Sequence, residues 1–358
     1  MSVPEKMYGV LLTGHGGLDK LEWRDDLDVP KPGEGEVLIR VLASSVNNTD
    51  INTRTAWYSK SVRGDTASGA VEGNVGANTA DGGWSGEPIL FPRIQGADCC
   101  GVIVAVGAGV PGSRIGERIL VRALQSTGAS GGLLSTWTFG SECNGAFAQF
   151  TKTFATDALP VQSDLSDTEL GAIPCAYSTA ETMLQKVGLN EERVLVTGAS
   201  GGVGFAAIQL AKRRGAHVTA MTSADKAKAI RSLGADKTLS RDDPFPANAF
   251  DSIVDLVAGP RWPDMIAALR RGGRYVTAGA IAGPIVELDV RTLYLRDLTL
   301  YGSTFQPDNI LRDVIGYVED GKLRPLIAQE FDLKEIHQAQ AAFLEKSHIG
   351  KIVIRLAR

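Results

Sequence analysis

Three glycines spaced three residues apart give the strongest chemical signal in the sequence. Gly198, Gly201 and Gly204 lie in VLVTGASGGVGFAAIQL, between an apolar run typical of a strand and a pattern typical of a helix. One glycine permits a tight turn, a second lets backbone N–H groups approach a pyrophosphate, and a third allows close helix–strand contact, while the helix N-terminus favours the anion. The pattern predicts a dinucleotide site, and the alternative is a purely structural turn. The other turn residues assigned to the site are Ser200, Gly202 and Val203.

The strand after this helix ends without a carboxylate. HVTAMT (217–222) is followed by Ser223, Asp225 and Lys226. An NAD site usually has an acidic residue here for the ribose 2′-hydroxyl, whereas a hydroxyl and an ammonium suit a 2′-phosphate. Asp225 is expected in the first turn of the next helix, where the helix dipole favours it. We therefore predict NADP(H) rather than NAD(H), bound by Thr222, Ser223 and Lys226.

The second half of the chain alternates short apolar strands with helical patterns. This order is typical of a parallel sheet with helices on both faces, in an α/β fold. Val257 and Gly279 each end one of these strands, and both are assigned to the cofactor site. The expected strands are 193–198, 217–222, 251–257 and 273–279, and the expected helices lie near 202–214, from 224 and near 261–271.

The two ends of the chain share a β-rich character. GEVLIRVLASSV (35–46) is typical of a strand, and a final strand is expected in GKIVIRL. This similarity predicts a discontinuous first domain, 1–160 with 306–358, into which 161–305 is inserted. The segment 59–90 is rich in Gly, Ser and Asn and has no sustained period. It is interpreted as a long loop, either a mobile surface insertion or a flap over an active site.

Composition limits the functions to consider. The chain has 358 residues, 44% of them hydrophobic, which suggests two domains. A net charge of −4 and scattered basic residues argue against nucleic acid and favour a small-molecule partner. The sequence has four cysteines without a pattern, no secretory segment and no apolar run near the ~18 residues that a membrane span needs. We therefore expect a cytoplasmic protein with no membrane partner.

Several segments, in order, resemble the medium-chain dehydrogenase/reductase superfamily, and within it the zinc-independent quinone oxidoreductase branch. The resemblance covers nearly the whole chain. It implies a GroES-like, β-rich substrate domain formed from both chain ends, together with a Rossmann domain that has a doubly wound parallel sheet. It also implies that Lys351, in the closing motif, lies near the cofactor. The segments are GEVLIRV, VNNTDINTRTAWY (46–58), GADCCGVIVAVGAGV, GERI (116–119), GASGGVG, SADKAKAIRSLGAD (223–236) and HIGKIVI (348–354).

The same resemblance implies that no metal is bound. Zinc alcohol dehydrogenases have Cys, His and Cys where this chain has Asn47, Ala97 and Cys175, and a catalytic zinc needs three protein ligands. The four clustered cysteines of the family's structural zinc lobe are also missing. Cys99 and Cys100 lie in an apolar run and are expected to be small core residues. We therefore predict no metal ligand.

Quinone oxidoreductases of this superfamily carry an Asn, then Asp at +3, Arg at +7 and Tyr at +11. Asn47, Asp50, Arg54 and Tyr58 match this pattern, whereas a tyrosine often found at +5 is Asn52 here. Asn47 and Tyr58 are the candidate catalytic residues, because each can donate a hydrogen bond to a substrate oxygen as hydride arrives. The alternative for both is loop capping and packing. Asp50 and Arg54 are expected to form a structural pair.

These observations predict an NADPH-dependent oxidoreductase that reduces quinones or α,β-unsaturated carbonyls by hydride transfer. The alternatives are an alcohol dehydrogenase with an atypical metal site at Cys175, and a non-catalytic NADPH-binding protein. LTLYGST (298–304) is expected to be an edge strand, and such edges are usually paired or protected. In the resembling family this strand pairs across a two-fold axis, which implies a homodimer or homotetramer.

Overall fold

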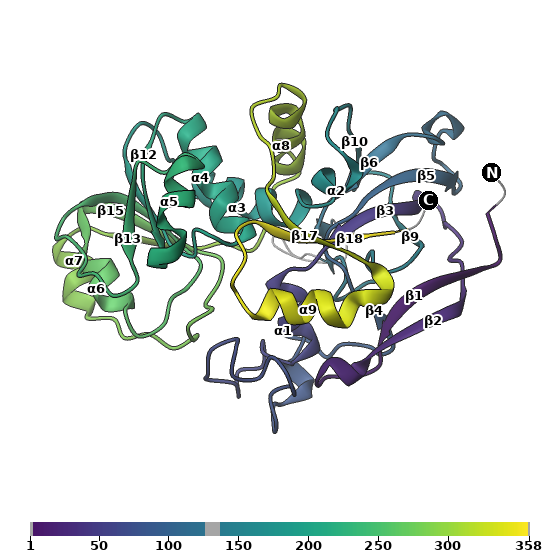
Figure 1. Cartoon of the computed structure of the whole chain (residues 1–358), viewed down its shortest axis with the longest axis horizontal. Coiled ribbons are helices and arrows are strands. Elements are labelled where there is room, and N and C mark those ends of the chain that lie inside the picture. Colours follow the sequence, from purple (N-terminus) through teal and green to yellow (C-terminus); the bar gives the residue numbers. More distant parts are fainter. Residues whose placement is uncertain (1–2, 126–136, 357–358) are drawn as a thin grey trace. The chain divides into compact units, whose positions relative to one another are not determined.

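The computed structural model describes residues 3–125 and 137–356, which divide into two compact units. The first unit is Met1–Val62, Ala67–Cys175 and Leu311–Arg358, and the second is Arg63–Thr66 and Ala176–Ile310. Both chain ends therefore belong to the first unit (Figure 1). The main breaks between units lie C-terminal to the boundaries at 160 and 306 that the sequence suggests.

The first unit is built on mostly antiparallel sheets. Its main sheet has the order β10-β6-β5-β3-β18-β17, with β9 also paired to β3, and a smaller sheet has the order β2-β1-β4. The strands are β1 (Lys6–Leu12), β2 (Leu21–Asp28), β3 (Glu36–Ser45), β4 (Arg93–Ile94), β5 (Cys100–Val106), β6 (Arg118–Val121), β9 (Phe150–Phe154), β10 (Ala158–Pro160), β17 (Ile327–Asp332) and β18 (Lys351–Arg355), and β7 (Leu124–Gln125) pairs with β8 (Trp137–Thr138). The helices are α1 (Asn48–Arg54), α2 (Asp167–Leu170), α8 (Ile310–Glu319) and α9 (Ile336–Leu344).

The strand β3 connects the two ends of the chain. It pairs antiparallel to β18, with Ser45 opposite Val353. Its side chains Val37, Ile39 and Val41 have no exposed surface and belong to the main apolar core of the unit. Fully burying such a side chain stabilises the fold by about 1.5–3 kcal/mol. The packing therefore fixes the end of β3, from which the chain runs directly into α1.

The second unit contains a six-stranded parallel sheet of order β13-β12-β11-β14-β15-β16. Apolar residues dominate its central strands, because both faces of a parallel sheet are covered. Figure 1 shows this sheet and its helices, of which α4 packs on β11 and β12, and α5 on β12 and β13. The strands are β11 (Arg193–Val196), β12 (His217–Thr222), β13 (Lys237–Ser240), β14 (Phe250–Asp255), β15 (Leu269–Thr277) and β16 (Thr299–Gly302). The helices are α3 (Pro174–Lys186), α4 (Gly202–Arg213), α5 (Ala224–Ser232), α6 (Trp262–Ala267) and α7 (Val290–Leu295).

The α/β fold predicted from the sequence is confirmed. The predicted strands of the second half correspond to β11, β12, β14 and β15. The expected edge strand is β16, which among the described residues pairs with β15 alone. Of the helices in the part of the chain that the structure describes, none has both the length and the apolar character to cross a membrane.

Candidate functional site

A buried carboxylate, Asp98, is the centre of a polar cluster in the first unit. Its Oδ2 accepts hydrogen bonds from Asn47 Nδ2 at 2.8 Å and from the Ser45 hydroxyl, and the Lys351 ammonium donates to it at 3.1 Å. Its Oδ1 accepts the backbone N–H of Cys175 at 2.7 Å. Asp98 is 0% exposed and Lys351 is 5% exposed. This ion pair is withdrawn from water, and such a pair is tolerated only where further hydrogen bonds satisfy both partners.

The Asn47 amide is fully engaged in this cluster. Its Oδ1 accepts from Lys351 Nζ at 2.5 Å, and its Nδ2 donates to Asp98 and, at 3.2 Å, to the Ser45 carbonyl. The structure thus places Asn47 and Lys351 together, although they are 304 residues apart in the chain. In this arrangement both amide hydrogens have protein acceptors. The expected role of Asn47 as a donor to substrate therefore requires it to release one of them, and it stays a prediction.

Asp50 holds the start of α1 and is itself buried. Its Oδ2 accepts the backbone N–H of Asn47 at 2.8 Å, and its Oδ1 accepts that of Gly96 at 3.2 Å. Burial and the charge of Asp98 raise the pKa of Asp50 to about 7, against the opposing effects of these N–H donors and of Lys351. The carboxyl therefore connects the α1 terminus to the segment that carries Asp98.

The expected pair between Asp50 and Arg54 is wrong. The Arg54 guanidinium is fully buried and donates to Gln340 Oε1 at 3.0 Å, to the Gly16 carbonyl at 2.7 Å and to the Ala70 carbonyl at 2.8 Å. The spacing of four residues on α1 would allow an ion pair. Asp50 instead accepts hydrogen bonds from backbone N–H groups, one of them at the start of α1. Arg54 donates to three segments that are distant in sequence.

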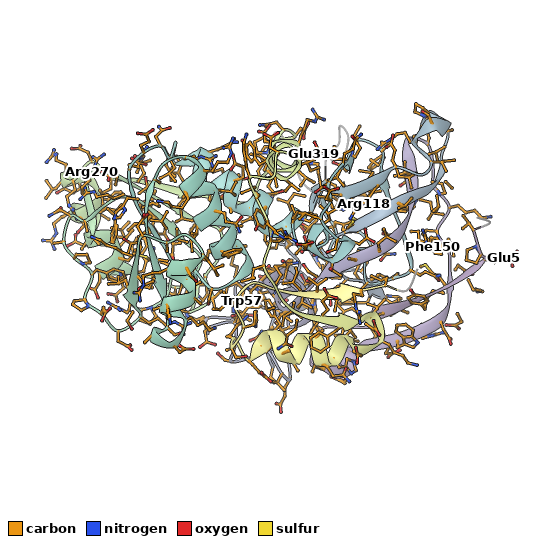
Figure 2. The ribbon with its side chains drawn as sticks, turned by 45° about the horizontal axis from the view of Figure 1, so that its top comes forward. Glu5, Trp57, Arg118, Phe150, Arg270 and Glu319 are labelled. Carbon is orange, nitrogen blue, oxygen red and sulfur yellow. The ribbon has the colours of Figure 1, made fainter. Side chains whose placement is uncertain are left out.

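Tyr58 lies on the loop after α1, inside an aromatic cluster. Its ring meets Trp57 edge-on at 5.9 Å between centroids and Trp84 edge-on at 5.0 Å; Trp57 is labelled in Figure 2. Burial raises the pKa of the Tyr58 phenol well above its ordinary value, and the nearby Thr49 and Asn52 side chains oppose this shift. The phenol is therefore neutral near pH 7 and is a hydrogen-bond donor.

The segment 59–90 is anchored beside this cluster. Trp84 belongs to it, the Ala70 carbonyl accepts from Arg54, and Asn74 Nδ2 donates to the Thr55 carbonyl at 2.9 Å. The insertion thus has specific contacts with α1 and the loop after it, and it packs against the candidate Tyr58. This placement favours the interpretation as a cover for the site over that of an unattached surface loop.

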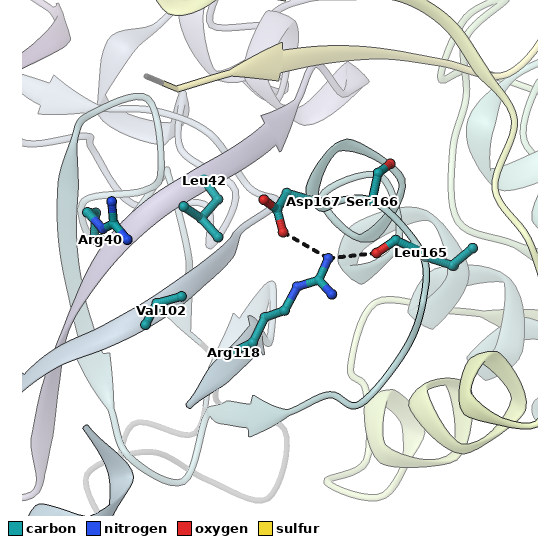
Figure 3. A pocket seen from close by; sticks show the side chains of 7 residues that line it. All are labelled: Arg40, Leu42, Val102, Arg118, Leu165, Ser166 and Asp167. Atoms are coloured by element: carbon teal, nitrogen blue, oxygen red, sulfur yellow. Dashed lines mark hydrogen bonds and ion pairs between the residues drawn. The ribbon is translucent and has the colours of Figure 1, made fainter. Parts of the chain in front are cut away.

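A separate cavity of about 500 Å³ in the first unit contains none of the predicted site residues. Figure 3 shows that Arg118 lies in it between Asp167, with which it pairs at 2.8 Å, and the Leu165 carbonyl, to which it donates at 2.7 Å. Arg118 is therefore already held by an ion pair and by a backbone carbonyl. The lining residues are Arg40, Leu42, Val102, Arg118, Leu165, Ser166 and Asp167.

The glycine-rich turn of the second unit joins β11 to α4. Gly198 has φ +59°, a conformation that side chains disfavour, and Gly201 is the residue before α4. A Cβ on Gly204 would lie 2.3 Å from the Gly198 carbonyl oxygen, so this position accepts no larger residue without movement. The turn thus presents the N-terminus of α4, with Ser200, Gly202 and Val203 half-buried beside it. Such a terminus favours a bound phosphate.

The other predicted cofactor residues follow the carboxyl ends of neighbouring strands. Thr222 ends β12, Ser223 precedes α5, Lys226 is in its first turn, and Val257 and Gly279 come shortly after β14 and β15. Because β11 pairs with β12 on one side and β14 on the other, the strand order reverses here, and α/β sheets bind ligands at such a point. Lys351 is the exception, since it belongs to the first unit.

Sequence reasoning missed the residues that support these sites. Asp98 lies in the GADCC segment, where no local pattern predicts its role. Asp255 accepts the Val257 N–H and the Tyr275 hydroxyl at 2.9 and 2.6 Å, and so fixes the loop after β14.

Comparisons with known proteins identify the class. Residues 33–163 match the family model of the alcohol dehydrogenase GroES-like domain, and residues 202–319 match that of the zinc-binding dehydrogenases. A solved structure from Sinorhizobium meliloti, provisionally assigned as an alcohol dehydrogenase, is 40% identical over 99% of this chain and 98% of its own, with a TM-score of 0.88. The chain therefore belongs to the medium-chain dehydrogenase/reductase superfamily and is an oxidoreductase.

More distant relatives carry reductase names. The acryloyl-coenzyme A reductase of Metallosphaera sedula is 26% identical over 97% of this chain and 99% of its own length. The chloroplastic quinone oxidoreductase of Triphysaria versicolor is 27% identical over 97% of this chain and 98% of its own. Members of this superfamily bind a nicotinamide cofactor, and the turn at Gly198–Gly204 is suited to one.

Asn47, Ala97 and Cys175 of the first unit occupy the three positions that hold zinc in the zinc enzymes of the superfamily. Asn47 accepts a hydrogen bond from the Lys351 ammonium, and residue 97 is alanine. Burial and the charge of Asp98 raise the pKa of the Cys175 thiol well above its ordinary value. A tetrahedral zinc needs three such ligands in deprotonated form. In the described parts of the chain no three His, Cys, Asp or Glu side chains are grouped to hold a metal ion. Cys99 and Cys100 are fully buried, which confirms them as core residues.

Proposed function

We propose that this protein is a zinc-independent, NADPH-dependent oxidoreductase that reduces quinones or α,β-unsaturated carbonyls. The observation that carries the proposal is the Lys351–Asp98–Asn47 cluster, in which a buried ammonium lies among the positions that hold zinc in the zinc enzymes of the superfamily. These hydrogen bonds occupy the Asn47 amide and both oxygens of the Asp98 carboxylate, so neither side chain is free to bind a metal ion. Relatives named for acryloyl-coenzyme A and for quinones act on conjugated acceptors, in agreement with this choice.

The protein's part in the reaction is to hold the acceptor and to stabilise charge. NADPH, held at the turn after β11, supplies the hydride when bound. Charge then develops on the oxygen of the acceptor, where a hydrogen-bond donor is most useful. The neutral Tyr58 phenol and the Asn47 amide are our candidate donors, and Asn47 would first release Ser45 or Asp98. Conjugate reduction is favoured over alcohol oxidation. Oxidation of an alcohol usually relies on a Lewis acid to stabilise the alkoxide, whereas hydrogen-bond donors can stabilise the oxygen that gains charge in conjugate reduction.

The alcohol dehydrogenase alternative is supported by relatives that carry that name, among them the S. meliloti structure. Metal content separates the two. We expect purified protein to contain far less than one zinc per chain and to keep NADPH-dependent reduction of an enone after exhaustive chelation. Elemental analysis and initial rates on the same sample test this. Zinc near one equivalent, lost together with activity, would contradict the proposal.

We also propose that the protein forms a homodimer or homotetramer through β16. This strand has one unpaired edge, and the neighbouring segment exposes large apolar side chains, among them Val290 (59%), Tyr294 (59%) and Leu295 (57%). A row of exposed apolar residues beside a free sheet edge is typical of an interface.

We also propose that the protein is cytoplasmic. Its four cysteines are free thiols, which agrees with a reducing compartment.

Leu295→Glu is expected to convert this oligomer to monomer, because it places a charge in the apolar interface. Light scattering at micromolar concentration measures the change in mass. The control is Val75→Glu, at a residue 95% exposed in the insertion, which should leave the mass unchanged. A wild-type monomer under these conditions would refute the interface.

A further inference from the structure

The loops after β12 and β13 leave the sheet side by side. The two strands are parallel, and Thr222 lies opposite Ser240 in their register. Each is the last residue of its strand, so Ser223 and Arg241 are the first residues to emerge at the same carboxyl edge. The candidate NADPH residues Ser223 and Lys226 therefore have Arg241 as a neighbour from the adjacent strand.

Two positive charges meet at this edge. Lys226 is 6% exposed, in the first turn of α5, and burial lowers the pKa of its ammonium, with the charge of Arg241 acting in the same direction. Asp225 opposes this effect, but its carboxylate is exposed and accepts a hydrogen bond from Ser223. Bringing like charges together at a buried lysine is unfavourable unless an anion joins them.

The backbone of Arg241 is held by a hydrogen bond, whereas its guanidinium has no partner among the described residues. Its carbonyl accepts from the Arg261 guanidinium, which also donates to the Asp243 carbonyl at 2.7 Å and lies 4.5 Å from the centre of the Phe245 ring. Within residues 3–125 and 137–356, no side chain or carbonyl pairs with the Arg241 guanidinium. The loop is thus held in place with an exposed arginine at the sheet edge.

A buried hydroxyl at the same edge also lacks a partner. Thr222 is 2% exposed, and its Oγ1 has no hydrogen bond to any described residue. A buried hydroxyl normally has a hydrogen-bond partner. The unpaired Thr222 hydroxyl therefore points to a bound group at the end of β12. It is an observation independent of the two charges.

We propose that Arg241 is a specificity-determining residue that binds the 2′-phosphate of NADPH together with Lys226. A guanidinium can bond two phosphate oxygens at once, while the ammonium supplies a compact charge from the first turn of α5. The inference rests on the proposed use of NADPH. It assigns half of the positive charge at that subsite to a residue directly after β13, outside the segment that follows β12.

Isothermal titration of 2′,5′-ADP and 5′-ADP into the intact protein tests this without turnover. Wild type should prefer 2′,5′-ADP, and Arg241→Ala should weaken that ligand by about 10- to 100-fold, the range for a hydrogen bond to a charged group, with 5′-ADP changed by less than about 2-fold. Arg241→Lys should recover part of the loss. The control, Arg231→Ala, removes an exposed charge from the other end of α5, where Arg231 donates to Thr238, and should change neither ligand.

The outcomes separate the two claims. Equal binding of both nucleotides by wild type would overturn the NADPH proposal and this inference with it. A wild-type preference for 2′,5′-ADP that Arg241→Ala leaves intact would overturn the role of Arg241 alone. Equal weakening of both nucleotides by Arg241→Ala would show a structural role and would also overturn the inference.

Discussion

Replacing Tyr58 with phenylalanine is expected to lower kcat and kcat/KM for an enone together, by up to about 10²–10³-fold, the effect of removing one oxyanion donor. The ring contacts with Trp57 and Trp84 do not involve the hydroxyl, so phenylalanine keeps the packing. Because burial raises the pKa of the phenol, the donor is protonated throughout the neutral range, and its loss should not shift the pH profile there.

Steady-state rates with NADPH and a conjugated ketone measure this effect, and nucleotide titration shows whether cofactor binding is intact. Tyr8→Phe is the matched control, since Tyr8 stacks on Trp23 at 5.3 Å in the sheet of β1 and β2 and is no part of the site. An unchanged kcat in Tyr58→Phe would remove Tyr58 from the mechanism but leave the cofactor assignment in place.

Lys351→Met is expected to lower the free energy of unfolding by about 3–5 kcal/mol, as for other buried ion pairs that lose one partner. The variant leaves the Asp98 carboxylate buried without its cation and Asn47 Oδ1 without its donor at 2.5 Å. The remaining hydrogen bonds to Asp98 do not replace a full charge.

Urea unfolding of wild type and variant measures this loss. The control is Lys152→Met, which breaks the ion pair with Glu36 at 2.6 Å in the same unit, where the Lys152 side chain is 40% exposed. An exposed pair of this kind contributes about 0–1 kcal/mol. A loss in Lys351→Met no larger than in the control would show that the buried pair does not stabilise the first unit.

Much of the fold follows from local sequence patterns. The helix expected near 202–214 is α4 (Gly202–Arg213), and the strand expected at 217–222 is β12 (His217–Thr222). These elements were predictable because short apolar strands, helical periodicity and glycine turns act over a few residues. The same holds for the Gly198–Gly204 turn, where Gly198 has a positive φ and a Cβ on Gly204 would lie 2.3 Å from the Gly198 carbonyl oxygen.

The Lys351–Asp98–Asn47 cluster could not be predicted, because it is formed by contacts between segments that are distant in sequence. The Asn47–Lys351 bond joins β18 to the end of β3, and only the folded sheet makes these neighbours. The expected pair of Asp50 and Arg54 does not form. Backbone N–H groups donate to Asp50, and Arg54 donates to segments distant in sequence. Trp84 lies in a segment without periodicity, so its contact with Tyr58 had no signal in the sequence.

The comparison of two reactions tests the central claim most directly. Wild-type initial rates should be measured for NADPH-dependent reduction of a quinone and an enone, and for NADP⁺-dependent oxidation of primary and secondary alcohols. An active site that has hydrogen-bond donors but no Lewis acid is expected to reduce the conjugated acceptors and to oxidise alcohols little or not at all. Robust alcohol oxidation without reduction of either conjugated acceptor would contradict the account.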